Sequence, residues 1–199
     1  MNLRERKAAK KREDILRSAS LVIAREGFQN ATMEEIAAEL LMTKGSLYYY
    51  FNSKQELLYH CHDWILSEAM EKMKEIVESS ISAPEKLKQA IKMHLGVAIQ
   101  EKDVFNLILK PAQIFPAEHI DAILIKRDQY AGYFDKIIQQ GIESAEFSAK
   151  NVKMVRMIIL GATNWVQVWY SPGGEFSEEE VQNIYADYLT EILIRKLKD

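Results

Sequence analysis

The amino-acid sequence predicts an all-α protein of about nine helices, and three observations support this fold class. Only eight glycines and four prolines occur in 199 residues, too few for a turn-rich β fold. Apolar residues recur at helical spacing, and no segment alternates apolar and polar residues for long enough to form a strand. Four pairs of a hydroxyl residue and a glutamate three positions later mark helix starts, because such pairs cap free backbone amides. The pairs are Thr32–Glu35, Ser53–Glu56, Ser82–Glu85 and Ser177–Glu180.

The first quarter of the chain is expected to hold three small helices. Residues 13–26 form an amphipathic segment that Gly27 is placed to end. Its apolar stripe consists of Ile15, Leu16, Ala19, Val22 and Ile23. Two very short helices follow, at about residues 33–40 and 43–50, and Thr43 is placed to cap the second. These helices make up an expected domain of residues 1–52.

The remaining residues, 53–199, are expected to form a larger helical domain. Its helices span about residues 54–78, 84–100, 103–110, 117–140, 148–171 and 177–197. Pro111 closes the third of these helices and Gly141 ends the fourth. Residues 171–174, Ser-Pro-Gly-Gly, separate the last two because they cannot continue a helix.

Composition excludes several classes of protein. Apolar residues make up 48% of the chain and charged residues 28%, which is ordinary for a globular protein. The single cysteine, Cys61, excludes an intrachain disulfide and fits a reducing compartment. No apolar run reaches the length of a membrane span, and no secretory signal opens the sequence. We therefore expect a cytoplasmic protein.

Signatures of catalysis are missing from the sequence. It has no glycine-rich phosphate loop, no HExxH, no nucleophile elbow and no paired cysteines. His60 and His62 flank Cys61, but on a helix they point about 200° apart and cannot bind one metal ion together. The sequence therefore predicts no enzyme, no cofactor and no metal.

Charge is distributed unevenly along the chain. The net charge is −3, yet residues 1–12 carry six basic side chains and only Glu5 as an acid. A basic amino end on an acidic body can orient a molecule toward polyanions, whereas the alternative is a merely solvated tail.

Residues 33–51 have the proportions of a helix-turn-helix, two short helices with a tight joint. One side of the second helix is apolar, with Leu47, Tyr50 and Phe51. The opposite side carries a cation, a hydroxyl, a glycine and two phenols, which make a poor protein core. This side suits a groove edged by phosphates. Its residues are Lys44, Gly45, Ser46, Tyr48 and Tyr49.

The segment ATMEEIAAELLMTKGSLYYYFNSKQELL resembles the DNA-binding segment of the TetR family of bacterial transcriptional repressors. The resemblance is close over about residues 12–60 and implies a DNA-binding domain followed by a ligand-binding and dimerisation domain. It implies that Thr32, Tyr48 and Lys54 hold phosphates and that residues 44–46 and Tyr49 face the groove, beside Thr43. Helix capping alone could also explain Thr32.

The sequence departs from the family at Leu41, where members often have a glycine in the turn. If this turn requires positive φ, Leu41 costs on the order of 1 kcal/mol. Packing of its hydrophobic side chain could recover that cost.

The resemblance also implies a homodimer, built by a four-helix bundle from the last two helices of each chain. The expected dimerisation residues lie on the apolar stripes of these helices. They are Met154, Ile158, Gly161, Ala162, Val181, Ile184, Tyr185, Tyr188 and Ile192. The alternative is that both stripes are buried within one chain.

A pocket for a hydrophobic small-molecule effector is expected among the middle helices. The candidate lining residues are Trp64, His94, Phe105, Leu109, Phe115, Tyr130, Phe134, Trp165 and Trp169. Aromatic residues at helical spacing are more often plain core, and a buried histidine such as His94 is more often a hydrogen-bonded core residue than a ligand contact. Residues 164–174, NWVQVWYSPGG, resemble a segment in family members that respond to acyl-CoA thioesters or other lipid-like acids.

Two functions of different classes remain. The leading one is a dimeric repressor that binds a palindromic operator on double-stranded DNA and that a hydrophobic effector, such as an acyl-CoA, releases by shifting the fourth helix. The alternative is an all-helical carrier of hydrophobic ligands, or an adaptor, that does not read DNA.

Overall fold

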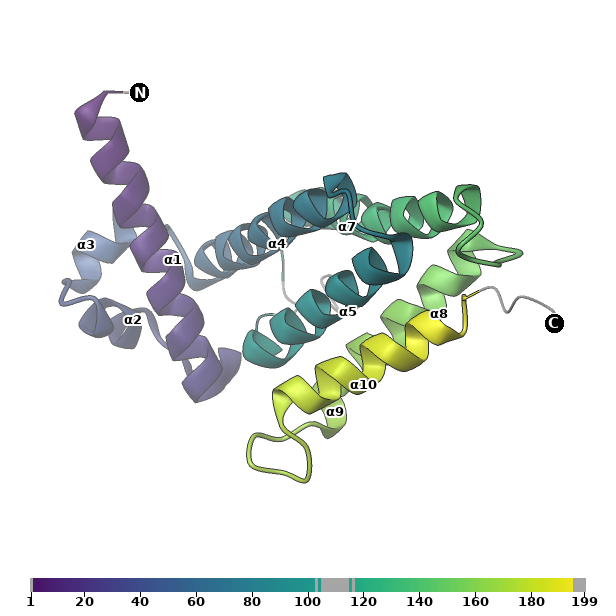
Figure 1. Ribbon diagram of the computed structural model, residues 1–199. Helices are drawn as coiled ribbons and strands as arrows, with labels where there is room; N and C mark the ends of the chain where they lie inside the picture. Colours follow the sequence, from purple (N-terminus) through teal and green to yellow (C-terminus); the bar gives the residue numbers. More distant parts are fainter. Residues whose placement is uncertain (1, 103, 105–114, 116, 195–199) are drawn as a thin grey trace. The chain divides into compact units, whose positions relative to one another are not determined.

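A computed structural model of the chain, which describes residues 2–102, 104, 115 and 117–194, is built of helices (Figure 1). The helices are α1 (Leu3–Asn30), α2 (Met33–Glu39), α3 (Lys44–Tyr48), α4 (Lys54–Glu78), α5 (Ala83–Gln100), α7 (Ala117–Glu143), α8 (Val152–Asn164), α9 (Val166–Trp169) and α10 (Glu178–Glu191). Within the described ranges, β-type pairing is limited to an isolated bridge between Phe147 and Ile194. The predicted all-α fold class is therefore confirmed. None of these helices is both long and apolar enough to cross a membrane, as far as the described residues go.

The chain divides into two compact units. The first comprises Met1–Ile65 with Glu101–Ile123, and the second comprises Leu66–Gln100 with Leu124–Asp199. The first unit thus extends beyond residue 52 and includes the amino-terminal part of α4.

The core of the first unit follows the predicted patterns. The stripe of α1 from Ile15 to Ile23 is buried, and so are Leu47 and Phe51 of the helix-turn-helix. Gly27 has a φ of 76° and interrupts the helical geometry of α1, as expected for a residue placed to end a helix. The helix itself begins earlier than predicted, at Leu3, because Asn2 and Glu5 form a further capping box there.

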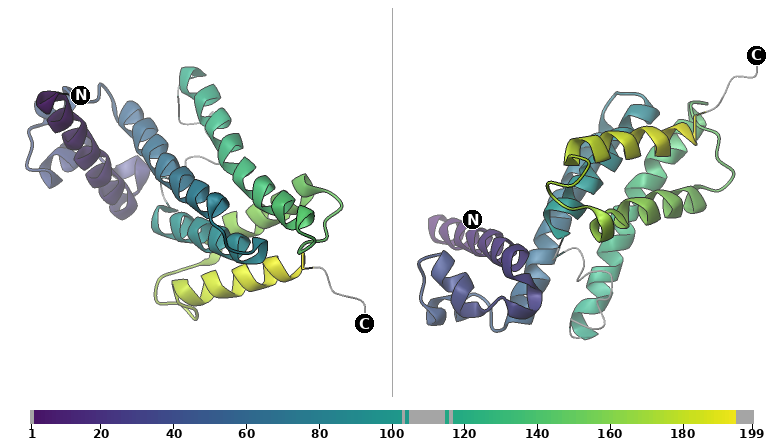
Figure 2. Two further views of the ribbon diagram at one scale, coloured as in Figure 1. Left: turned by 45° about the horizontal axis from the view of Figure 1, so that its top comes forward. Right: turned by 90° about the horizontal axis from the view of Figure 1, so that it is seen from below.

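In the second unit, α5 packs against α8, α9 and α10 (Figures 1 and 2). The buried ammonium of Lys86 joins α5 to two other helices. It donates to the Val77 carbonyl of α4 at 2.8 Å and to Gln140 Oε1 of α7 at 3.0 Å. These bonds tie together segments far apart in sequence.

The sequence analysis expected Gly141 to end α7, but Gly141 lies within this helix. A Cβ at this position would overlap the ring of Phe147, so glycine is needed for close packing and not for termination. The helix ends at Glu143, and the chain turns at Ala145, which has a φ of 61°, so that the Glu146 amide donates back to the Gly141 carbonyl.

The helix expected at 148–171 is two helices, α8 and α9, with a break at Trp165. The Asn164 carbonyl accepts the side-chain amide of Gln167 at 3.0 Å, while the Val168 amide donates to the Trp165 carbonyl instead. The side chain of Gln167 thus replaces a regular helical hydrogen bond. The last helix ends at Glu191 and not near 197; the expected helix at 103–110 lies almost entirely outside the described residues.

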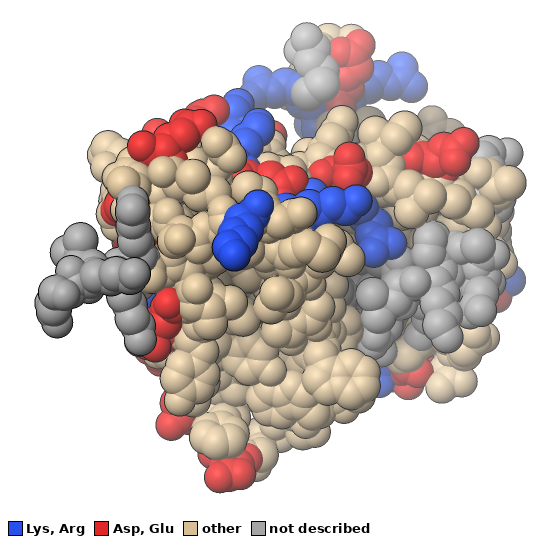
Figure 3. Space-filling model, turned by 90° about the vertical axis from the view of Figure 1, so that its right-hand side faces the viewer, with Lys and Arg blue, Asp and Glu red and all other residues tan. Residues whose placement is uncertain are grey.

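Large apolar side chains remain exposed on α8, α9 and α10. They are Met154, Met157, Ile158, Trp165, Val168, Trp169, Ile184 and Tyr188. Figure 3 views the molecule from the side toward which α8 lies in Figure 1, and a broad uncharged area is visible below a band of charged groups. A monomer that leaves so many apolar side chains in water has surface available for a partner.

Candidate nucleic-acid interface

A tight joint connects α2 to α3. The Met42 amide donates to the Ala37 carbonyl at 2.8 Å, and the Leu41 amide donates to the Ala38 carbonyl at 3.0 Å. This pair of bonds is the Schellman motif, which requires a left-handed residue after the helix. Leu41 is that residue, with a φ of 53°. The positive φ considered for this turn is therefore present.

The Leu41 side chain is 97% exposed. The sequence analysis considered that packing of the Leu41 side chain could offset the cost of its positive φ. This expectation is wrong within the single chain, because the side chain packs against almost nothing. Sequence reasoning also did not place Leu41 among the candidate site residues. The signal available in the sequence was an apolar leucine at a turn position that favours glycine.

Thr43 begins α3 as predicted. Its hydroxyl oxygen accepts from the Ser46 amide at 3.1 Å, and the two hydroxyls lie 2.8 Å apart. The capping bond orients the first turn of α3 and holds the Ser46 hydroxyl beside Thr43.

The outward face of the second short helix is exposed. Among residues 44–49, all of which the structure describes, Leu47 alone is buried. Tyr49 is 83% exposed and stands edge-on to Tyr50, with ring centroids 5.3 Å apart. The structure thus brings the predicted groove-facing side chains together on one solvent-facing surface.

Lys44 forms an ion pair with Glu34 of α2, and both side chains are more than half exposed. The hydrogen bond with Glu34 raises the pKa of Lys44 above its ordinary value, and that with Lys44 lowers the pKa of Glu34. Glu34 was not among the predicted site residues. Its carboxylate lies where it can compete with an anionic ligand for the Lys44 ammonium.

Gly45 has no packing role within the chain. A Cβ built at this position meets no atom within 4 Å, and its φ is not positive. Neither contacts nor backbone conformation therefore require glycine here. The missing side chain leaves open space in front of the backbone of α3.

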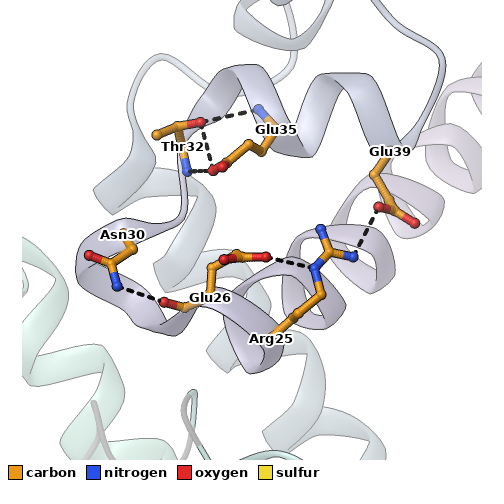
Figure 4. A network of polar contacts seen from close by, with 6 residues as sticks. All are labelled: Arg25, Glu26, Asn30, Thr32, Glu35 and Glu39. Atoms are coloured by element: carbon orange, nitrogen blue, oxygen red, sulfur yellow. Dashed lines mark hydrogen bonds and ion pairs between the residues drawn. The ribbon is translucent and has the colours of Figure 1, made fainter.

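Thr32 and Lys54, the predicted phosphate contacts, already have partners in the chain. Thr32 caps α2, and the Glu35 carboxylate accepts its hydroxyl and amide, both at 2.8 Å (Figure 4). The Lys54 ammonium donates to the Gln29 carbonyl at 3.2 Å. Figure 4 also shows the contact between Arg25 of α1 and Glu39 of α2. Helix capping thus explains Thr32, as the sequence analysis allowed.

The predicted effector residues are distributed over both units. His94, Tyr130 and Phe134 lie together in the second unit, where His94 and Tyr130 have ring centroids 5.7 Å apart. Trp64 and Phe115 belong to the first unit, and Trp165 and Trp169 are exposed. Phe105 and Leu109 lie outside the described residues.

His94 is a buried, hydrogen-bonded histidine. Its Nε2 donates to Asn164 Oδ1, which can only accept, and its Nδ1 accepts from the Tyr130 hydroxyl, both at 2.9 Å. Burial lowers the pKa of His94 to about 4, so the ring is neutral at pH 7. Three helices supply this chain of bonds.

The predicted dimerisation residues fall into two groups. Met154, Ile158, Ile184, Tyr188 and Ile192 are exposed, together with Gly161, whereas Ala162 and Tyr185 are half-buried. Val181 is only 2% exposed, so it packs within its own chain and offers little surface to a partner. Met157 and Val168 are also exposed, but the sequence analysis did not include them. Each lies three residues after another exposed apolar residue, Met154 or Trp165, and this helical spacing was a signal for them.

Cys61 is buried, and its thiol donates to the Leu16 carbonyl at 3.6 Å. Burial raises the pKa of this thiol to about 12, so it is not a thiolate at neutral pH. In the described part of the chain, no group of three histidine, cysteine or acidic side chains is arranged to hold a metal ion.

Comparison with known families gives two matches. Residues 15–61 match the model described as bacterial regulatory proteins of the tetR family. Residues 80–193 match the model of the tetracyclin repressor-like C-terminal domain. Together these matches include the helix-turn-helix and most of the second unit.

Two curated relatives cover most of the chain. The fatty acid metabolism regulator protein of Bacillus subtilis is 27% identical over 161 residues, which are 76% of this chain and 81% of that protein. The HTH-type transcriptional repressor KstR2 of Mycolicibacterium smegmatis is 28% identical over 191 residues, 89% of this chain and 87% of that protein.

Solved structures share the fold. A TetR/AcrR-family regulator from Thermobifida fusca has a TM-score of 0.78 at 23% identity, covering 91% of this chain and 97% of its own. FadR from Bacillus subtilis in complex with stearoyl-CoA has a TM-score of 0.72 at 22% identity, covering 88% and 96%. AibR in complex with isovaleryl coenzyme A and operator DNA has a TM-score of 0.69 at 22% identity, covering 92% and 97%.

Proposed function

Because this chain belongs to the TetR family of bacterial regulatory proteins, we propose that it is a ligand-responsive repressor that binds a palindromic operator as a homodimer. One observation carries the proposal: among the residues from Lys44 to Tyr49, every residue except Leu47 is exposed, and together they form an outward surface. A repressor of this kind acts where the bacterial chromosome lies, in the cytoplasm.

The chemistry of this surface fits the major groove. Lys44 can reach a guanine edge or a phosphate once it leaves Glu34, and the open space at Gly45 lets the backbone approach the bases. The phenols of Tyr48 and Tyr49 can donate to phosphate oxygens. Thr32 and Lys54 would hold phosphates at the edges, and Thr43 would fix the start of the reading helix.

The basic amino end extends the same interaction. Residues 3–12 are the first turns of α1, and their basic side chains are mostly exposed. A helix carrying six basic side chains beside a DNA-reading domain adds phosphate contacts, so we expect binding to weaken steeply as salt rises.

Dimerisation would cover the apolar face of α8 and α10. Its centre would consist of the exposed predicted residues, with Gly161 allowing close approach of the helices. The exposed residues are Met154, Ile158, Ile184, Tyr188 and Ile192. Two reading helices are needed for the two half-sites of a palindrome, which a dimer with twofold symmetry supplies.

The effector we propose is a hydrophobic small molecule, and an acyl-CoA is the favoured class. Support comes from the relative named for fatty acid metabolism and from the neighbours solved with stearoyl-CoA and isovaleryl coenzyme A. His94 and Tyr130 form a buried aromatic cluster with Phe134 and contribute its polar atoms, so they are the first candidates for contact with the effector.

The central experiment is a DNA-binding titration. An operator is selected from the upstream region of the gene, and fluorescence anisotropy is measured at several salt concentrations. We expect saturable binding of two chains per palindrome. Lys44→Ala should change which sequences are preferred, whereas Lys54→Ala should weaken binding to all sequences alike.

The outcomes separate the two functions left open by the sequence. Absence of saturable DNA binding would favour the carrier or adaptor. Binding that neither substitution alters would show that the residue assignments are wrong even though the family is right. For the effector, an acyl-CoA series is added to the complex, and release of DNA at stoichiometric ligand supports the proposal. Native mass spectrometry of the protein from its source shows whether a thioester is retained.

A further inference from the structure

Leu41 combines two properties that are unfavourable in the free chain. Its backbone is left-handed, with a φ of 53°, which is unfavourable for a residue with a branched apolar side chain. Its side chain is 97% exposed and gains nothing from burial. Ala145 is the other non-glycine residue with positive φ among those described. It carries only a methyl group, so Leu41 alone combines this conformation with a large exposed apolar side chain.

Leu41 forms one wall of a shallow hollow on the first unit. The hollow is lined by Leu41, Met42, Thr43, Ser46, Tyr49 and Tyr50. Ser46 and Tyr49 belong to the proposed groove-facing surface, so the hollow is continuous with it. Leu41, Met42 and the tyrosine rings supply the apolar part of its wall, and the hydroxyls of Thr43 and Ser46, which bond to each other, supply polar atoms.

An occupant of this hollow that covers the exposed Leu41 side chain must present an apolar group to it, and it belongs to whatever the surface of α3 binds. In the major groove of DNA, one base presents such a group: the 5-methyl of thymine. We propose that this hollow receives a thymine methyl group in each operator half-site, with Leu41 as the specificity-determining contact. The inference rests on the proposed function, because it places the methyl group on the same DNA.

The size of the effect follows from the group that is buried. Removing one methyl from contact with an apolar wall corresponds to about fourfold in affinity. In a palindrome both half-sites change together, so the symmetric substitution is expected to weaken binding about sixteenfold.

The test uses the full-length protein and its selected operator. Each thymine pair is replaced in turn by deoxyuridine, which keeps every hydrogen bond of the base and lacks the methyl group. We expect replacement at one symmetric pair of positions to weaken binding of the unaltered protein by about sixteenfold. With Leu41→Gly, which suits the turn, the same replacement should have no effect.

Ala145→Gly is the matched control, because it removes a side chain from the other left-handed position and lies in the second unit. It should leave the response to deoxyuridine unchanged. If the operator is bound and no deoxyuridine position weakens binding, or if the response persists in Leu41→Gly, the inference is overturned while the proposed function stands. If Leu41→Gly weakens all sequences alike, Leu41 contacts the sugar-phosphate backbone and the inference is also overturned. Failure to bind any operator refutes the proposed function itself.

Discussion

Gly45, the exposed glycine of α3, allows an effect on stability to be separated from an effect on the proposed DNA binding. In Gly45→Ala, the added Cβ meets no atom of the chain within 4 Å. Alanine is favoured over glycine in helices by up to about 1 kcal/mol, so the variant should be at least as stable as the parent. For a chain of this size, a gain of that order raises Tm by about 2–4 °C.

DNA binding should respond in the opposite direction. If the backbone of α3 approaches the base edges at Gly45, the new methyl group lies where a base would be. The expected loss is that of a mismatched base pair, about 1–3 kcal/mol for each half-site. This corresponds to a dissociation constant raised by about 5- to 150-fold per half-site.

The assay pairs thermal unfolding with anisotropy titration on the selected operator. Gly132→Ala of α7 is the control, since its Cβ also meets no atom within 4 Å and it lies in the second unit. It should gain similar stability and keep full DNA affinity. An operator affinity of Gly45→Ala within twofold of the parent would refute the close approach of this backbone.

Three further substitutions test the charges and packing described above. Glu34→Gln removes the ion pair of Lys44 and one negative charge beside α3. DNA affinity should therefore rise about two- to fivefold at low salt and less at high salt. An unchanged affinity would mean that the ion pair does not compete with DNA. Gly141→Ala places a Cβ against the Phe147 ring and should lower the free energy of unfolding by about 1–3 kcal/mol; an unshifted thermal transition contradicts this packing. His94 has a folded-state pKa of about 4, below its ordinary value of 6.5, so the unfolded chain takes up the proton first as the pH falls and stability is lost between those two values. Between pH 7 and pH 5 the parent should lose about 2 kcal/mol more than His94→Gln in denaturant titrations, and equal losses would show that the ring is not buried and neutral.

Local sequence signals predicted helix starts well. Thr32 with Glu35 and Ser177 with Glu180 form complete capping boxes in the structure. At Ser53 and Ser82 the hydroxyl accepts the glutamate amide, but the carboxylate binds elsewhere, to Asn52 and to Gln89. A cap depends on atoms a few residues apart, which is why the pattern is readable without the fold.

Helix ends were harder to predict where glycine has another use. Gly27 does interrupt α1, whereas Gly141 continues α7 because Phe147 needs the space of its missing side chain. A glycine near the end of a helix can thus either interrupt the helix or provide space for a neighbouring side chain. Which of the two applies depends on a neighbour that the tertiary structure reveals.

The outward character of α3 was determined by the sequence alone. With 3.6 residues per turn, Leu47 and Phe51 must face one way and Ser46 and Tyr49 the other, and burial follows from polarity. Tertiary structure decided what lies farther away along the chain: the pairing of Lys44 with Glu34, the burial of Val181 beside an exposed Ile184, and the partners of His94, which are 36 and 70 residues distant. Periodicity tells which side of a helix avoids water, but it does not tell which other helix, or which second molecule, will cover that side.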